Sequence, residues 1–185
     1  MTLKRLLIIS FFSILAGGVF AQPTHVVTDP ERKFKDVKEY MIKEEYALAY
    51  PLVKELMAMY PENQASNHSY LHEDARFYYI VCGLKLMHPV SRDEAAAFIY
   101  SVNNEPRRQI MAFHLAHYYF LQNEFEQAIE YFDIAGYNNL SNEQIADAKF
   151  EKAYAYFNLK QFAQAKPLFD EIHQMPEHKY YIPAN

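Results

Sequence analysis

The fold is decided by residues 112–135, which read AFHLAHYYFLQNEFEQAIEYFDIA, together with residues 149–172, which read KFEKAYAYFNLKQFAQAKPLFDEI. Both stretches place a tyrosine, a phenylalanine, an alanine and a second phenylalanine at the same spacings: Tyr119, Phe125, Ala128 and Phe132 in the first, and Tyr156, Phe162, Ala165 and Phe169 in the second. A pattern that recurs in register is the sequence signature of a repeat architecture.

A third copy of the pattern lies nearer the N-terminus, where Tyr40, Tyr46, Ala49 and Val53 keep the same spacings. Positions three and four apart share one face of a helix, so each copy predicts two helices that pack side by side. Alanines at the crossing let the helix axes approach, and larger side chains fill the space around them. We assign the packing faces to Tyr40, Tyr46, Ala49, Leu115, Ala116, Tyr119, Phe125, Ala128, Phe132, Ala153, Tyr156, Phe162, Ala165 and Phe169.

Capping residues and prolines place the helix boundaries. The runs Ser91-Arg92-Asp93-Glu94 and Ser141-Asn142-Glu143-Gln144 both fit a reciprocal capping pattern, and Asp29-Pro30 and Pro106 suit helix starts. The pair within residues 70–103 is irregular, because its alanines are out of register and its turn, residues 87–90, is longer than the others. We expect helices at residues 30–42, 45–59, 71–87, 92–102, 106–121, 124–136, 142–158 and 161–174.

These residues resemble the tetratricopeptide repeat (TPR) family, whose pattern runs Trp-x2-Leu-Gly-x2-Tyr, then Ala, Phe and Pro, with a period of about 34 residues. The best copy matches at Leu115, Ala116, Tyr119, Ala128, Phe132 and Ala135. It departs from the family at Ala112, which replaces the tryptophan, and the next copy has Lys152 at the leucine position. The resemblance implies an all-α, right-handed solenoid of about four stacked antiparallel hairpins in domain 30–185, at residues 30–60, 70–103, 106–137 and 142–175.

The N-terminus predicts export. A basic start at residues 1–5 precedes an apolar run at residues 6–15, and small residues lead to a cleavage site after Ala21. We interpret residues 1–21 as a signal peptide and residues 22–29 as a linker. No cysteine follows the apolar run at the cleavage point, so we expect a periplasmic or outer-membrane-associated protein of the bacterial cell envelope that is not a lipoprotein. Because residues 180–185 read as the opening of another helix, we expect a longer repeat protein.

Composition argues against several function classes. The net charge is −5 and the basic residues are scattered, which disfavours nucleic acid as a partner. The sequence has neither a nucleophile with its base nor a glycine loop for phosphates, so we expect no enzyme and no cofactor. His114 and His117 are one helical turn apart, but no third ligand lies at metal-binding spacing, so we expect no metal. The single cysteine, Cys82, is interpreted as a small buried apolar residue.

The TPR resemblance implies a protein-binding scaffold in which the first helix of each repeat lines a concave groove. The groove residues would be Phe113, His117, Phe120, Phe150, Tyr154 and Phe157. They lie off the stripe that packs within each pair, so they face either a partner peptide or a neighbouring helix of the same chain. The alternative function is a structural spacer or self-associating module, with any active domain beyond residue 185.

Overall fold

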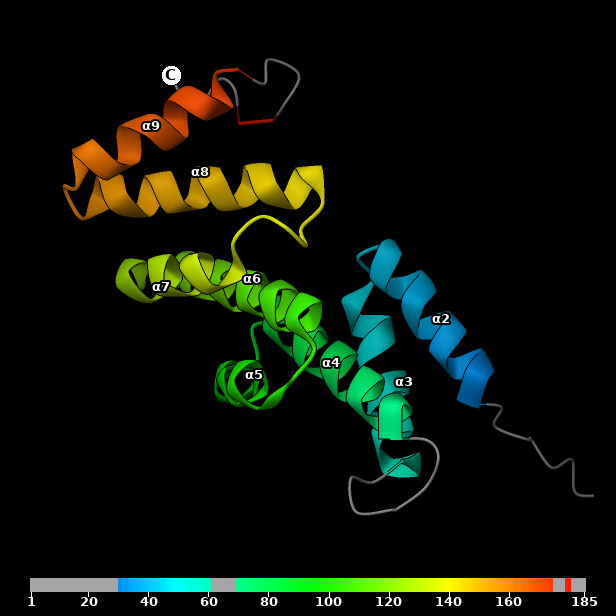
Figure 1. Cartoon of the computed structure of the whole chain (residues 1–185). Coiled ribbons are helices and arrows are strands. Elements are labelled where there is room, and N and C mark those ends of the chain that lie inside the picture. The colour runs from blue at the N-terminus through cyan, green and yellow to red at the C-terminus, as the bar shows by residue number, and fades with distance from the viewer. Residues whose placement is uncertain (1–29, 61–68, 175–178, 181–185) are drawn as a thin grey trace, which may run out of the picture.

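The computed structural model describes residues 30–60, 69–174 and 179–180, and over these residues the chain is all-helical (Figure 1). The expected signal peptide, the linker, the Asp29 cap and residues 181–185 lie outside the described residues. No helix in the described part has the length and apolar character needed to cross a bilayer. The helices are α2 (Pro30–Ile42), α3 (Tyr46–Met59), α4 (Ser69–Lys85), α5 (Pro89–Ser101), α6 (Glu105–Leu121), α7 (Phe125–Ala135), α8 (Asn142–Asn158) and α9 (Phe162–Ile172).

Three-residue turns with one shared geometry join α2 to α3, α4 to α5, α6 to α7 and α8 to α9. The middle residue of each turn has a φ of 57° to 60°, at Glu44, Met87, Asn123 and Lys160. The next residue donates its N–H to the carbonyl five positions earlier, at 2.8 to 3.0 Å. This is the closing bond of a Schellman motif, which satisfies carbonyl groups at a helix end. The repeat therefore extends to the backbone of the turns.

The start of α5 corrects two sequence-based expectations. The turn before it is residues 86–88, no longer than the others, and the helix begins at Pro89, with His88 rather than Ser91 at the N-cap. The helix begins at Pro89 because the fixed φ and missing N–H of proline suit the first helical turn. Ser91 is instead buried inside the helix, and a Cβ added at Gly83 would lie 2.0 Å from the Ser91 Oγ. Helices α4 and α5 therefore approach each other closely at Gly83 and Ser91, where a side chain larger than glycine would not fit.

Each helix packs against the next, and α6 also contacts α4 and α8 (Figure 1). The alanines expected at the crossings, Ala49, Ala128 and Ala165, are buried. One core cluster draws on α4 to α8, and a second lies between α2, α3 and α4. Cys82 is buried as expected, and burial raises the pKa of its thiol to about 12. The all-α prediction is confirmed, with a repeat-like order of contacts along the chain.

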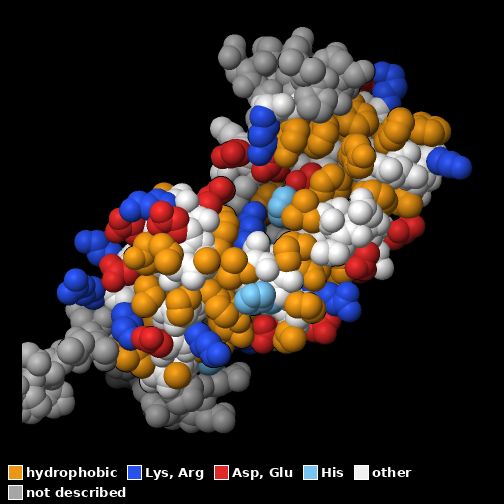
Figure 2. Space-filling model, turned by 180° about the vertical axis from the view of Figure 1, so that it is seen from behind, with side chains coloured by type: hydrophobic (Ala, Val, Ile, Leu, Met, Phe, Trp, Pro, Cys, Tyr) orange, Lys and Arg blue, Asp and Glu red, His pale blue; other side chains and the backbone are white. Residues whose placement is uncertain are grey.

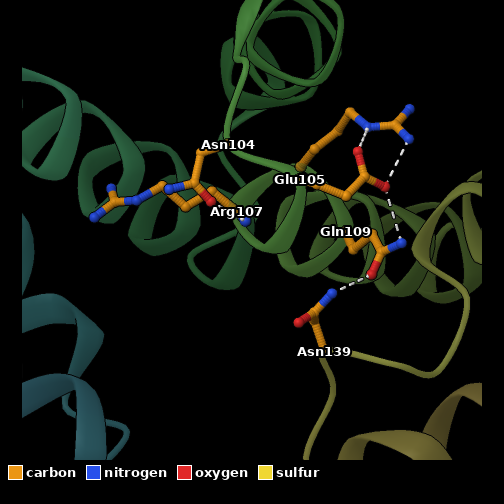
Figure 3. Close-up of polar contacts among 6 residues, drawn as sticks. Asn104, Glu105, Arg107, Gln109 and Asn139 are labelled. Carbon is orange, nitrogen blue, oxygen red and sulfur yellow. Dashed lines mark hydrogen bonds and ion pairs between the residues drawn. The ribbon is translucent and has the colours of Figure 1, made fainter.

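Polar side chains fix the start of α6 and the loop that leads to α8 (Figure 3). The Asn104 side chain caps α6 by accepting a hydrogen bond from the Arg107 N–H at 3.1 Å. Glu105 accepts from the Gln109 amide at 2.9 Å, and Gln109 accepts from the Asn139 amide at 2.6 Å. Asn139 lies in the loop between α7 and α8, so these contacts connect that loop to α6.

The capping box expected at the start of α8 is confirmed. Ser141 Oγ accepts a hydrogen bond from the Gln144 N–H at 3.2 Å, and the Gln144 side chain accepts one from the Ser141 N–H at 3.0 Å. Two N–H groups without helical partners are satisfied in this way. The cap sets where α8 begins and therefore how its side chains lie along α6.

Candidate functional site

The predicted groove residues of α6 contact other helices of the chain. We name Phe113, His117 and Phe120 the α6 stripe. Phe113 is only 3% exposed. The Nδ1 atom of His117 lies 2.8 and 2.9 Å from the two carboxylate oxygens of Glu151, and the Phe120 ring meets the Tyr154 ring edge-on at 5.7 Å. In α6 the stripe is therefore a helix–helix contact within the chain.

The residues at the same spacing in α8 have a different environment. We name Phe150, Tyr154 and Phe157 the α8 stripe. Tyr154 is 42% exposed and Phe157 is 54% exposed. Next to Phe157 lies Phe162, at a ring distance of 5.4 Å and 55% exposed, although its position in the repeat predicted a packing role. The open end of the α8 stripe thus forms an aromatic surface near the α8–α9 turn.

The other end of the α8 stripe is covered by Lys179 and Tyr180, which we name the C-terminal pair. The Tyr180 ring stacks on Phe150 with centroids 4.0 Å apart and planes 2° apart. The Lys179 ammonium lies 2.8 Å from the carboxylate of Asp147, one helical turn before Phe150. Burial, followed by the charges of Asp147 and Glu151, raises the pKa of Tyr180 to about 12. The pair is therefore seated on α8 through one ion pair and one ring stack.

A cleft of about 790 Å³ lies beside the C-terminal pair, between the α2–α3 turn, α4, α6 and the start of α8. Figure 2, which views the molecule from behind, shows hydrophobic side chains around a hollow in which basic and histidine side chains are visible. The acidic, basic and histidine residues that line the cleft are Glu44, Lys85, His114, His117, Glu143, Asp147 and Lys179.

Burial favours the neutral forms of two side chains beside this cleft. Burial, with smaller effects from Lys85 and His117, lowers the pKa of His114 to about 3. Burial raises the pKa of the Glu151 carboxyl above its usual value, although the bond to His117 acts in the opposite direction. Among the described residues, His114 Nδ1 is buried with no hydrogen-bond partner. Over the same residues, no three metal-ligating side chains are placed to hold a metal ion.

Sequence reasoning missed Glu151, Asp147 and Lys85. The signal for Glu151 was present, because it is a charged residue between Ala148 and Ala155 on the buried face of α8. A charge in such a place needs a partner on the facing helix, and His117 supplies it. Lys85 carried no comparable signal, since it is the last residue of α4, where basic residues are common. Asp147, in the second turn of α8, was missed because its partner Lys179 lies 32 positions away.

Comparison with models of known protein families, with curated protein sequences and with solved structures finds no match to this chain. The relation to the tetratricopeptide repeats therefore stays a proposal based on the residues quoted above.

Proposed function

We propose that this chain is a TPR-like scaffold that binds a helix of a partner protein on the open end of the α8 stripe. In this proposal the four turn-linked pairs are antiparallel hairpins stacked as a right-handed solenoid. The observation that carries the proposal is the contrast between two equivalent faces. The α6 stripe is covered by a helix, whereas Tyr154 and Phe157 on α8 are about half exposed over the described residues.

A helix is the occupant that this surface favours. Residues at spacings of three and four lie on one side of α8, and a facing helix matches such a row with its own side chains. The contact of α8 with the α6 stripe is an example within the chain, since Glu151 and Tyr154 meet His117 and Phe120. Exposed aromatic side chains next to one another are typical of interaction surfaces, where each ring buries a large area on binding.

The proposal narrows the groove expected from the sequence. Three of its six residues, Phe113, His117 and Phe120, already contact residues of this chain, so they are not the surface we propose for a partner. In the C-terminal pair, Tyr180 covers the ring of Phe150. Tyr154 contacts Phe120 and Phe125 but keeps 42% of its surface exposed, so its outer part remains together with Phe157, and Phe162 extends the surface beyond them.

The cellular setting that we propose rests on the N-terminal sequence alone. Residues 1–21 would act as a signal peptide, placing the scaffold in the periplasm or at the outer membrane of a bacterial cell envelope. Expression of the full sequence in a bacterium, followed by N-terminal analysis of the periplasmic fraction, tests this. We expect a chain that begins at Gln22; a cytoplasmic chain that still begins at Met1 would contradict the proposal.

The binding function is tested by selection from a displayed library of amphipathic helical peptides against the full chain. We expect enriched peptides to bind at micromolar affinity, and we expect Tyr154→Ser with Phe157→Ser to weaken them at least tenfold. Tyr100→Ser is the matched control, because Tyr100 is an aromatic residue of α5 with 71% exposure. Absence of enrichment, or equal loss in the control, would reject the surface.

Self-association is a second candidate, favoured by the chemistry around Phe162. Burial of the Phe162 ring, which is 55% exposed and lies beside the uncharged Asn158, Gln161 and Gln164, favours a contact between two copies. The exposed Lys160 and Lys166 at the edge of this surface oppose it. Sedimentation velocity over a range of concentrations tests this candidate. A mass that rises in the wild type and stays monomeric in Phe162→Ser would favour the spacer or assembly role over partner binding.

A further inference from the structure

The C-terminal pair indicates which chemistry the first part of the α8 stripe accepts. Lys179 lies on Asp147 at 2.8 Å, with a second carboxylate, that of Glu143, at 3.9 Å. Tyr180 lies flat on Phe150. The two residues that bind are adjacent in sequence, and they come from more than twenty positions beyond the helix that they contact. Their contacts therefore indicate which side chains the surface of α8 accepts, because they are not imposed by residues adjacent in sequence.

The position of the pair relates it to the helix that covers α6. Helix α6 begins at residue 105, α8 begins at residue 142, and Lys179 is residue 179, so both intervals are 37 residues. Lys179 and Tyr180 thus occupy, relative to α8, the chain positions that Asn142 and Glu143 occupy relative to α6. Their position in the chain is that of the first turn of a covering helix.

The acidic charge at this end distinguishes α8 from α6. The residue of α6 that is equivalent to Asp147 is Ile110, and the residue equivalent to Glu143 is Pro106. Neither could pair with a cation. Helix α4 does carry such a charge: Asp74, the sixth residue of α4 as Asp147 is of α8, pairs with Arg107 in the first turn of α6. The Arg107 guanidinium also lies over the Phe77 ring, at 5.5 Å from its centroid. A preference for a basic residue is therefore a property that α8 shares with α4 and that α6 lacks.

We propose, on the basis of the docking function above, that the α8 stripe selects partner helices whose first turn carries a basic residue followed by an aromatic one. The basic residue pairs with Asp147 and Glu143, and the ring stacks on Phe150. Lys179 and Tyr180 occupy the same two places, so they compete with the partner. Opposite charges across the contact discriminate between partners, which is the usual contribution of charge to an interface.

The probe is a synthetic peptide in which Lys-Tyr precedes the sequence of residues 144–158, with Glu151→Gln because Tyr154 replaces His117 on the target surface. Two matched peptides begin with Glu-Tyr and Lys-Ala. Calorimetric titration into the full chain is expected to rank Lys-Tyr first, by about three- to fivefold over Glu-Tyr. In the variant Lys179→Ser with Tyr180→Ser, the Lys-Tyr peptide is expected to bind more tightly than to the wild type.

Charge reversal at Asp147 tests most directly whether α8 prefers a basic residue at this place. In Asp147→Lys we expect the order to invert, so that Glu-Tyr binds more tightly than Lys-Tyr; Asp147→Asn, the milder change, should abolish the difference. Unchanged helicity by circular dichroism is required of each variant. If all three peptides bind equally and Phe157→Ser weakens them all, the docking function holds and this inference is wrong. If no peptide binds the wild type or the Lys179→Ser, Tyr180→Ser variant, both are wrong.

Discussion

Helices α6 and α8 carry aromatic stripes of identical spacing in different environments. His117 and Phe120 contact residues of α8, whereas Phe113 is almost fully buried beside Phe132 of α7. Their equivalents, 37 residues later, are Phe150, Tyr154 and Phe157, of which the last two are about half exposed. The same residue spacing thus serves as internal packing in one helix and, over the described residues, as a partly exposed surface in the other.

The difference shows what a repeat pattern does and does not define. Spacing along a helix defines a face, and apolar side chains on that face favour its burial against another element. Which element covers it depends on residues far away in the sequence. The α6 stripe is covered in part by α8, where the buried Glu151 is matched to His117. Among the described residues, Lys179 and Tyr180 cover one end of the α8 stripe, and its partly exposed remainder is the surface that we propose for a partner.

The largest expected difference between the stripes is in stability. Phe113→Ala should lower the free energy of unfolding by about 3–5 kcal/mol, because it leaves a cavity in the core. Phe157→Ala should change it by less than about 1 kcal/mol, because the ring is about half exposed. Urea denaturation followed by circular dichroism measures both. Similar losses in the two variants would mean that the stripes do not differ in environment.

Next in size is the effect of the pair between His117 and Glu151. His117→Phe should destabilise the chain by about 2–4 kcal/mol, because it leaves the buried Glu151 carboxyl without its partner. Tyr154→Phe, the equivalent position in α8, should change stability by less than about 0.5 kcal/mol. A double-mutant cycle of His117→Phe with Glu151→Gln isolates the coupling. A coupling near zero would show that the two side chains contribute independently.

His114 in α6 and Glu151 in α8 also occupy equivalent positions, and their contributions to stability should depend on pH in opposite directions. The folded-state pKa of His114, about 3, is below the usual value of 6.5. Its contribution to stability is therefore present above pH 6.5 and is lost as the pH falls toward 3, by on the order of 2–4 kcal/mol. The variant His114→Phe should lack this loss in denaturation curves taken from pH 7 to pH 3.5. Parallel curves for variant and wild type would refute the burial argument.

Glu151 has the opposite dependence on pH. Its folded-state pKa is raised, so its contribution is complete below the usual pKa of 4.5 and is lost as the pH rises through the raised value. Glu151→Gln cannot ionise. Relative to that variant, the wild type should therefore become less stable as the pH rises above 4.5, which is the reverse of the trend at His114.

The smallest effect concerns the turns that follow the two helices. Asn123 and Lys160 both have a left-handed backbone, with φ of 59° and 60°. Lys160→Gly should stabilise the chain by about 0.5–1 kcal/mol, and Asn123→Gly by less, because asparagine tolerates this conformation better than lysine. Thermal melting of the two variants measures the order. A larger gain at Asn123 would contradict it.

The sequence was sufficient to predict the helices and the capping box at Ser141, because these depend on local pattern. Ser91 was misassigned because two start signals lie two residues apart, and the backbone constraint of Pro89 outweighs a serine cap. The pairing of Glu151 with His117 was missed because it joins residues 34 positions apart. For the same reason the pattern left open whether each aromatic stripe faces a partner or a neighbouring helix.

The most direct test of the account places a photo-crosslinking benzoylphenylalanine at Phe157 or at its equivalent, Phe120, and adds the Lys-Tyr helical peptide. We predict that the peptide is crosslinked from position 157 and not from position 120, because one stripe is open and the other is covered by α8. Crosslinking from position 120 alone, or equally from both, would contradict the claim that the partner helix docks on α8.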